Sequence, residues 1–287
     1  MNFTLGTATF GSNYGIANHG KVLQMKDCFE ILDAAQSLEI QSLDTAPDYG
    51  TSEEIIGKFY HTNPNFKIYT KISGNVEISI QSVKYALSQS KAKLNYQKLE
   101  GVYFHSPEKL ISSQKKQVKE VIAWIRENGI TSKVGISVYE EDQLKRMAED
   151  YPELNLFQVP ENILDRRLLD SQVVRELKKE GAEFNIRSIF LQGLLLMKEN
   201  EAPLKLKKAF PKISQLIEIA SSYRITLENL CLSYAQSISW ASNLIIGVHS
   251  KAQLFKILQH TPVKLDLREL PEPLATEILD PRSWIQS

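Results

Sequence analysis

Residues 40–60 read IQSLDTAPDYGTSEEIIGKFY and contain the transition that decides the fold. A short apolar run ends at Asp44, a turn-rich stretch follows it, and residues suited to a helix start appear at Ser52. Strands that pass into helices are the units of parallel sheets, because parallel strands need a crossover connection. The stretch therefore predicts one strand–helix step of an α/β fold.

The same unit recurs along the whole chain. Strand-like runs lie near residues 3–9, 40–44, 66–71, 100–105, 132–137, 155–160, 183–189 and 243–248. Helix-like stretches include 26–38, 52–60, 76–93, 114–128, 140–149, 171–180, 210–222, 226–239 and 250–259. Alternation of this kind without a Pro/Gly/Ser-rich linker predicts one domain over residues 1–287. The expected architecture is a (β/α)8 TIM barrel, a parallel eight-stranded barrel with outer helices.

A doubly wound open sheet is the competing architecture. That fold would place a GxGxxG turn after the first strand. The chain offers Gly6, Gly11 and Gly15 there, and their spacing does not match the pattern.

Composition and charge are those of an ordinary globular protein, with 43% hydrophobic and 24% charged residues. Lys plus Arg equals Asp plus Glu at 34 each, so neither nucleic acid nor a membrane is an expected partner. The start MNFTLGTATFG lacks a secretory pattern, and no apolar run reaches the roughly 18–20 residues that span a bilayer. Cys28 and Cys231 are too isolated for a disulfide framework or a metal site. We expect a cytoplasmic protein with two buried free thiols and no metal.

Four polar residues at or just after strand ends form the candidate site: Asp44, Tyr49, Lys71 and His105. If their strands are parallel neighbours, all four side chains emerge at the same end of the sheet, where α/β enzymes keep their chemistry. A phenol beside a lysine ammonium that a carboxylate holds is expected to have a lowered pKa. Such a tyrosine is a candidate general acid.

Several blocks together resemble an aldo-keto reductase of the short bacterial type. They are LGTATFG at 5–11, DTAPDYGTSEEIIG at 44–57, YTK at 69–71, YFHSPE at 103–108, GISVY at 135–139, FQVPENILDRR at 157–167, IRSIFLQGLLL at 186–196 and LIIGVHSKAQL at 244–254. The resemblance implies reduction of an aldehyde or ketone by NADPH, with NAD possible as the cofactor. By the family pattern Tyr49 protonates the carbonyl oxygen, Lys71 stabilises the phenolate, Asp44 orients Lys71, and His105 positions the carbonyl.

The resemblance also implies a cofactor site. Thr7 matches a position near the nicotinamide ribose, and Ser137 and Gln158 match residues that hold the carboxamide. Val138 stands where many members have Asn, and Arg187 replaces the aromatic residue that often stacks on the nicotinamide. Backbone groups of the 188–193 run are expected to wrap the pyrophosphate through Ser188, Phe190, Gln192 and Gly193. Residues after the eighth strand are expected to hold the adenosine phosphate, namely Gly247, His249, Ser250 and Gln253.

Other functions remain open from the sequence. One is a regulatory or sensing subunit that binds a nicotinamide cofactor with little turnover. Another is an isomerase or aldolase that uses Lys71 as a Schiff-base amine, although Asp44 beside it disfavours this chemistry. The partner is expected to be a small carbonyl compound: a small aldehyde, a sugar-derived carbonyl or a quinone-like ketone. The sequence predicts no oligomeric state.

Two segments carry structural expectations. The 193–210 stretch, GLLLMKENEAPLKLKKAF, is expected to be a lid or a solvated loop. The tail from Leu270 is expected to pack across the outside of the barrel.

Overall fold

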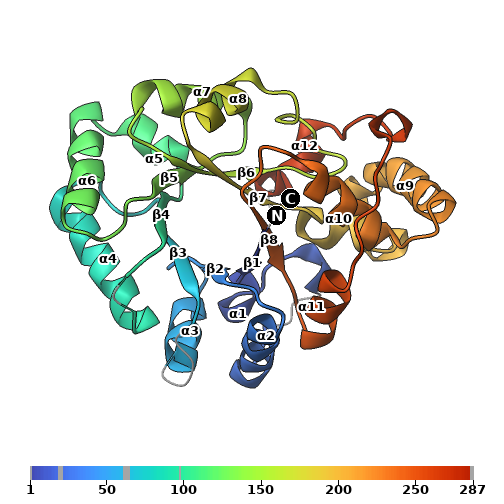
Figure 1. Ribbon diagram of the computed structural model, residues 1–287, viewed down its shortest axis with the longest axis horizontal. Coiled ribbons are helices and arrows are strands. Elements are labelled where there is room, and N and C mark those ends of the chain that lie inside the picture. Colours follow the sequence, from blue (N-terminus) through green and yellow to red (C-terminus); the bar gives the residue numbers. More distant parts are fainter. Residues whose placement is uncertain (1, 19–21, 61–64, 97, 285–287) are drawn as a thin grey trace.

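Eight parallel strands form a closed barrel in the computed structural model, which describes residues 2–18, 22–60, 65–96 and 98–284 (Figure 1). The strands pair in chain order: β1 (Asn2–Gly6), β2 (Ser42–Asp44), β3 (Lys67–Ile72), β4 (Gly101–Phe104), β5 (Val134–Ser137), β6 (Leu156–Pro160), β7 (Glu183–Arg187) and β8 (Asn243–Gly247). Closure comes from β1 and β8, where Leu5 lies opposite Ile246. Beyond these strands the Thr9 hydroxyl donates to the Val248 carbonyl oxygen at 3.0 Å.

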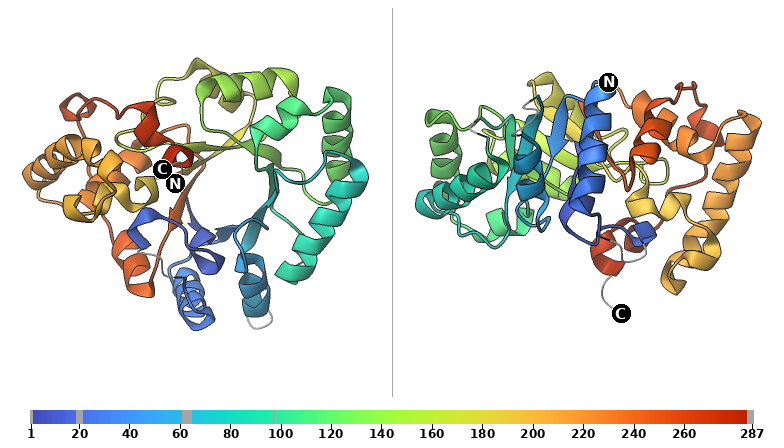
Figure 2. Two further views of the ribbon diagram at one scale, coloured as in Figure 1. Left: turned by 180° about the vertical axis from the view of Figure 1, so that it is seen from behind. Right: turned by 90° about the horizontal axis from the view of Figure 1, so that it is seen from below.

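Helices surround the barrel in both views of Figure 2. The longer ones are α2 (Met25–Ser37), α3 (Ser52–Tyr60), α4 (Ile80–Leu94), α6 (Lys115–Glu127), α7 (Glu141–Asp150), α8 (Gln172–Lys179), α9 (Phe210–Ser222), α10 (Leu227–Ser237) and α11 (Lys251–Leu258). Short helices are α1 (Ala8–Gly11), α5 (Pro107–Ser112) and α12 (Thr276–Leu279), with 3-10 turns η1 (Ile16–Asn18), η2 (Leu191–Leu196), η3 (Glu199–Glu201), η4 (Leu204–Ala209), η5 (Leu267–Glu269) and η6 (Pro281–Trp284). The barrel prediction is confirmed, and the open-sheet alternative is wrong because β1 pairs with β8.

Local sequence explains where individual elements begin and end. In α6 the side chains of Val118, Val121, Ile122 and Ile125 recur at helical spacing and are buried against the barrel. Gly129 follows with φ +63°, a left-handed conformation that glycine adopts without steric cost. The first strand ends earlier than the sequence suggests, at Gly6, because residues 8–11 turn into α1.

The inside of the barrel is unusually polar. The Thr4 and Ser42 hydroxyls lie 2.7 Å apart, and the Asn185 amide donates to the Tyr103 hydroxyl at 2.5 Å. TIM barrels usually fill this space with branched aliphatic side chains. Here a small cluster of Tyr69, Tyr103 and Leu156 is separate from the large apolar core that includes the helix faces. The barrel can therefore support charged groups at its catalytic end.

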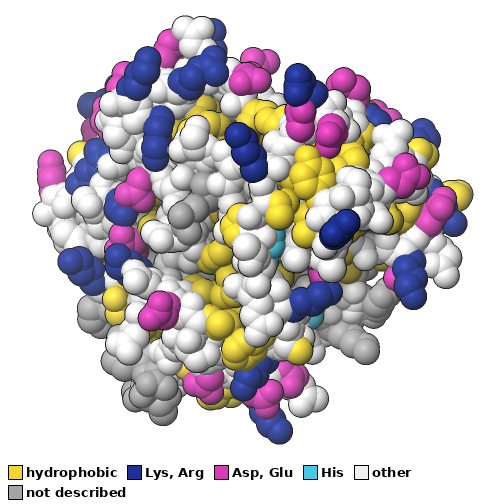
Figure 3. Space-filling model, turned by 45° about the vertical axis from the view of Figure 1, so that its right-hand side comes forward, with side chains coloured by type: hydrophobic (Ala, Val, Ile, Leu, Met, Phe, Trp, Pro, Cys, Tyr) yellow, Lys and Arg dark blue, Asp and Glu magenta, His cyan; other side chains and the backbone are white. Residues whose placement is uncertain are grey.

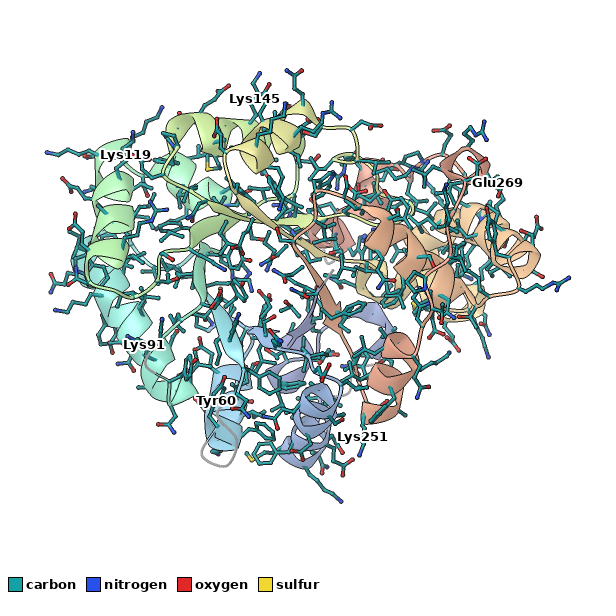
Figure 4. The ribbon with its side chains drawn as sticks, viewed as in Figure 1. Tyr60, Lys91, Lys119, Lys145, Lys251 and Glu269 are labelled. Atoms are coloured by element: carbon teal, nitrogen blue, oxygen red, sulfur yellow. The ribbon has the colours of Figure 1, made fainter. Side chains whose placement is uncertain are left out.

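The outer surface carries no strong charge of one sign on the face shown in Figure 3, where basic and acidic side chains are interspersed. Lys119 and Lys145 point outward from α6 and α7 (Figure 4). Within the described part of the chain, no helix combines the length and apolarity required to cross a bilayer. Cys28 and Cys231 are buried free thiols, as expected.

The tail packs against the outside only in part. The Arg166 guanidinium donates to the Pro271 carbonyl oxygen, and the Leu274 amide donates to that of Leu164. Residues beyond α12 then reach the loop that follows β5, where the Arg282 guanidinium lies 3.8 Å from the centroid of the Tyr139 ring. Accordingly the two chain ends lie on opposite sides of the molecule in Figure 2, right.

The 193–210 stretch is not a solvated loop throughout. It folds into the 3-10 turns η2, η3 and η4, and it buries Leu194, Leu206 and Ala209. The expectation of a solvated loop is therefore wrong for these residues.

Candidate active site

A buried ion pair lies at the centre of the catalytic end of the barrel. The Lys71 ammonium on β3 donates to both Asp44 carboxylate oxygens, at 2.7 and 2.8 Å, and to the Thr45 carbonyl oxygen at 3.0 Å. Lys71 is 1% exposed and Asp44 is 4% exposed. Because an ammonium has three hydrogens, these acceptors use its full donor capacity. Burial lowers the pKa of Lys71, and the adjacent carboxylate opposes that shift.

Two glycines place Tyr49 above this pair. Gly50 has φ +60°, and a Cβ there would lie 2.1 Å from the carbonyl oxygen of Gly11. A Cβ on Gly11 would in turn lie 2.2 Å from the Tyr49 carbonyl oxygen. The loops after β1 and β2 therefore touch through backbone atoms. This contact sets the Tyr49 ring with its centroid 4.9 Å from the Lys71 nitrogen.

The pKa of Tyr49 is shifted in the direction opposite to the one that the sequence suggested. It lies well above the ordinary value, because the phenolate would be desolvated and would face the Asp44 carboxylate. The expectation of a lowered pKa is wrong for the protein alone, because burial of the phenol is the largest effect on its pKa. Tyr49 is consequently a phenol that keeps its proton at neutral pH.

His105 pairs with a residue of the Tyr49 loop. Its Nδ1 lies 2.7 Å from the Asp48 carboxylate, and its ring meets the Tyr49 ring edge to face at 6.0 Å between centroids. The hydrogen bond from His105 lowers the pKa of Asp48. The four strand-end residues are thus brought together, and Asp48 joins them. Its position next to Tyr49 in the sequence was the available signal for this role.

A cavity of about 340 Å³ opens beside Tyr49. Most of the residues that the resemblance assigned to the cofactor line it: Gln158, Arg187, Ser188, Phe190, Gln192, Gly193, Gly247, His249 and Gln253. Asp44 and Tyr49 also line this cavity. Other lining residues escaped the sequence prediction because no motif marks them, namely Ala17, Leu196, Met197 and Glu201.

Three residues assigned to the cofactor do not line the cavity. The Thr7 hydroxyl donates to the Asp44 carbonyl oxygen at 2.9 Å, and this hydrogen bond holds the end of β2 against the residue that follows β1. Ser137 is buried, with its hydroxyl 3.5 Å from the Gln158 amide oxygen. The Ser250 hydroxyl caps α11 by accepting a hydrogen bond from the backbone N–H of Gln253 at 3.1 Å.

Gln158 connects the cavity to the ion pair. Its amide nitrogen donates to the Asp44 carboxylate at 2.7 Å. That carboxylate is therefore held by hydrogen bonds from two side chains, those of Lys71 and Gln158.

Backbone strain is concentrated in the cavity wall after β7. Ser188, Leu191 and Gln192 have φ of +64°, +46° and +51°, values that non-glycine residues seldom adopt. Strain of this kind clusters at ligand sites. In addition, the buried His249 Nδ1 has no hydrogen-bond partner among the described residues. A cavity whose wall combines backbone of positive φ with an unused imidazole nitrogen is suited to a nucleotide ligand.

No group of three or more His, Cys, Asp or Glu side chains could hold a metal ion in the part of the chain that the structure describes.

The chain belongs to the aldo/keto reductase family, whose sequence model matches residues 2–272. It is 20% identical to a D-threo-aldose 1-dehydrogenase from a Pseudomonas species, over 96% of this chain and 95% of that protein. Solved structures with the same fold include an aldo-keto reductase from Bacillus halodurans in its holo form, with TM-score 0.78, 18% identity and coverage of 97% and 95%. A glycerol dehydrogenase from Gluconobacter oxydans follows, with TM-score 0.74, 17% identity and coverage of 93% and 88%. The protein is an NAD(P)H-dependent oxidoreductase, as its sequence motifs implied.

Proposed function

We propose that the protein reduces an aldehyde or ketone to an alcohol with NADPH, with Tyr49 as the general acid. The observation that carries this proposal is the position of the protonated Tyr49 phenol, in the cavity wall above the Lys71–Asp44 pair. A bound nicotinamide supplies the hydride. Tyr49 donates its proton to the carbonyl oxygen and regains one from water after the product leaves.

Lys71 acts on Tyr49 through its charge. Because all three ammonium hydrogens are bonded to Asp44 and Thr45, it has no hydrogen left for the phenol oxygen. As the phenol loses its proton, the nearby cation stabilises the phenolate, and Asp44 keeps that cation in place. His105, fixed by Asp48, orients the carbonyl oxygen toward Tyr49.

The Lys71 geometry disfavours the Schiff-base alternative. A Schiff-base lysine must be neutral and free to attack. The Lys71 ammonium donates hydrogen bonds to both oxygens of the Asp44 carboxylate. Reaction at its nitrogen would leave that carboxylate buried without its cation.

Preference for NADPH rests on the residues around the start of α11. His249 lines the cavity with an unused Nδ1, and Ser250 and Lys251 follow it in the first turn. A phosphate group would find a cation and helix amides there. From this NADPH preference we also propose a cytoplasmic location, because NADPH is a cofactor of intracellular reduction.

The test combines binding with turnover. NADPH and NADH are titrated by fluorescence, and aldehydes and ketones are then screened at the nicotinamide absorbance band. Tyr49→Phe should reduce kcat by about 10²- to 10⁴-fold while the dissociation constant of NADPH stays within about twofold. Tyr14→Phe, which removes another phenol of the cavity wall, serves as the matched control.

Three outcomes separate the alternatives. NADPH binding without turnover across the panel supports the sensing subunit. A Tyr49→Phe variant with most of its activity removes Tyr49 from the acid role. Equal affinity for NADPH and NADH contradicts the proposed phosphate preference.

A further inference from the structure

Arg187 is a guanidinium in the cavity wall without a carboxylate partner. It ends β7, lines the cavity beside Tyr14 and Tyr49, and is only partly buried. Its side chain donates to the Ser188 hydroxyl at 3.1 Å and to the Val138 carbonyl oxygen at 3.3 Å, both neutral acceptors. Within the described ranges it forms no ion pair. A guanidinium has five N–H donors, so several remain for a ligand.

A second guanidinium provides an internal comparison. Arg187 and Arg282 both lie against the Tyr139 ring, with guanidinium carbons 4.1 and 3.8 Å from its centroid. Arg282, however, donates to both Asp280 oxygens, at 2.8–3.1 Å, and to Glu108 at 3.4 Å. It does not line the cavity. Of the two cations on this ring, therefore, Arg282 is neutralised and Arg187 is not.

The charge of Arg187 reaches the groups that would react. It lowers the pKa of Tyr49, against the larger opposing effects of desolvation and Asp44, and it lowers that of Lys71. The charge of Arg187 also contributes to lowering the pKa of Asp280, but the Asp280 oxygens accept hydrogen bonds from Arg282. The other charged groups that line the cavity are Asp44, paired with Lys71, and the exposed Glu201. An anion in the cavity would therefore find its strongest attraction at Arg187.

We propose that Arg187 selects carbonyl substrates that carry an anionic oxygen group, a carboxylate or a phosphate, at the end remote from the carbonyl. The planar guanidinium matches two oxygens of either group. The Tyr139 ring behind it fixes the guanidinium plane, so little side-chain freedom is lost on binding. Arg187 and Tyr49 line the same cavity, so a substrate anchored at Arg187 can extend its carbonyl toward Tyr49. This inference rests on the proposed function, since it names the substrate class of that site.

The first experiment compares matched substrate pairs. The carboxylate arm uses 4-nitrobenzaldehyde and 4-carboxybenzaldehyde, and the phosphate arm uses glyceraldehyde and glyceraldehyde 3-phosphate. The wild-type protein should prefer the charged member of at least one pair by about tenfold or more in kcat/KM, expressed mainly in KM. Arg187→Met should remove that preference, Arg187→Lys should keep part of it, and Arg282→Met should leave it intact.

A binding measurement keeps the inference separate from turnover. Calorimetry of the NADP⁺-loaded protein with benzoate and with benzamide should show benzoate bound about tenfold more tightly, and Arg187→Met should equalise the two. If no carbonyl is reduced but benzoate is preferred, the proposed function fails and the anion site stands. If neutral aldehydes are reduced without preference for charge, or if Arg187→Met retains the preference, the anion site is overturned and the reductase stands. Thermal melts and an NADPH titration establish that each variant is folded and binds the cofactor, and Arg187→Lys decides if Arg187→Met fails either test.

Discussion

The Asp48 carboxylate lies 2.7 Å from Nδ1 of His105, joining the loop after β2 to the end of β4. This bond fixes the imidazole plane beside the Tyr49 ring. It also commits Nδ1, so the other ring nitrogen is the one available to a substrate.

His105→Gln should raise the pKa of Asp48 toward its ordinary value, because the hydrogen bond from His105 is the main cause that lowers it. A lowered carboxyl pKa stabilises the fold above its unfolded value near 3.9, and this contribution is lost as pH falls through the folded value. Carboxyl NMR titration measures the shift. Asp266, whose pKa Arg268 lowers to about 2, should not respond and serves as the internal control. An unchanged Asp48 titration would contradict the coupling.

Breaking the Asp44–Lys71 pair at one partner should cost much more stability than replacing both partners together. Asp44→Asn or Lys71→Met leaves a buried group uncompensated and should reduce the free energy of unfolding by about 3–5 kcal/mol. The double variant Asp44→Leu/Lys71→Met should recover much of that loss. Urea unfolding measures both, and one shared transition by fluorescence and circular dichroism is expected if residues 1–287 form one domain.

An exposed ion pair supplies the matched control. Lys93 and Glu54 lie 3.5 Å apart with 39% and 48% of their side-chain surfaces exposed. Lys93→Met should change the free energy of unfolding by less than about 1 kcal/mol. A similar loss in both pairs would mean that burial is not the cause.

Carbonyl reduction should not lose rate through ionisation of Tyr49 between pH 7 and about 9. The pKa of this acid is raised well above its ordinary value near 10, so it stays protonated throughout that range. A pH profile of kcat with saturating cofactor measures this. The opposite result would be a loss of activity centred below pH 8 that persists when other tyrosines are substituted. That result would assign a low pKa to Tyr49.

Alkaline pH should destabilise the protein through its barrel tyrosines. Burial raises the pKa of Tyr69 to about 12 and raises that of Tyr103 well above its ordinary value. The folded protein therefore holds protons that the unfolded chain releases near pH 10, and stability is lost as pH rises above that value. Tyrosinate absorbance and circular dichroism should change together. Early, separate ionisation of these buried phenols would contradict this explanation.

Gly11→Ala should displace Tyr49, because its Cβ would meet backbone atoms of Tyr49, Thr51 and Ser52 within 2.5 Å. We expect a loss of about 1–3 kcal/mol in stability and at least a tenfold loss of kcat. Gly129→Ala is the control: it adds backbone strain at φ +63° but meets nothing within 4 Å. This variant should lose stability without a change in kcat per folded molecule.

Much of the fold, and the strand-end positions of the site, could be predicted from sequence because they depend on periodicity, whereas the cofactor residues were expected from the family resemblance. Strand ends at Asp44, Lys71 and His105 meet at one rim as soon as the strands are parallel and adjacent. The pKa direction of Tyr49 could not be predicted in this way. It depends on the burial of the phenol and on the nearby Asp44 carboxylate, and a strand pattern contains neither quantity.

The surroundings of Arg187 were also beyond the sequence. Its position could be aligned with the family's stacking residue, but its contact with Tyr139 depends on the path of two loops. Likewise, the placement of Arg282 on the same ring depends on where the tail ends after a long passage outside the barrel. Ser250 caps α11, and its phosphate-binding role stays a prediction, because the phosphate-binding pattern and the helix-cap pattern use the same residue type.

The hydrogen bond from Thr9 to Val248 spans 239 positions of the chain, and it lies beside the seam of β1 and β8. During synthesis, β1 leaves the ribosome first but obtains its second neighbour only after almost the whole chain has been made. Until then it presents an unpaired strand edge, which other chains can pair with. Closure of the barrel therefore joins a strand that is made early to one that is made late. Yield in the cell should depend on how well that first strand is shielded while it waits.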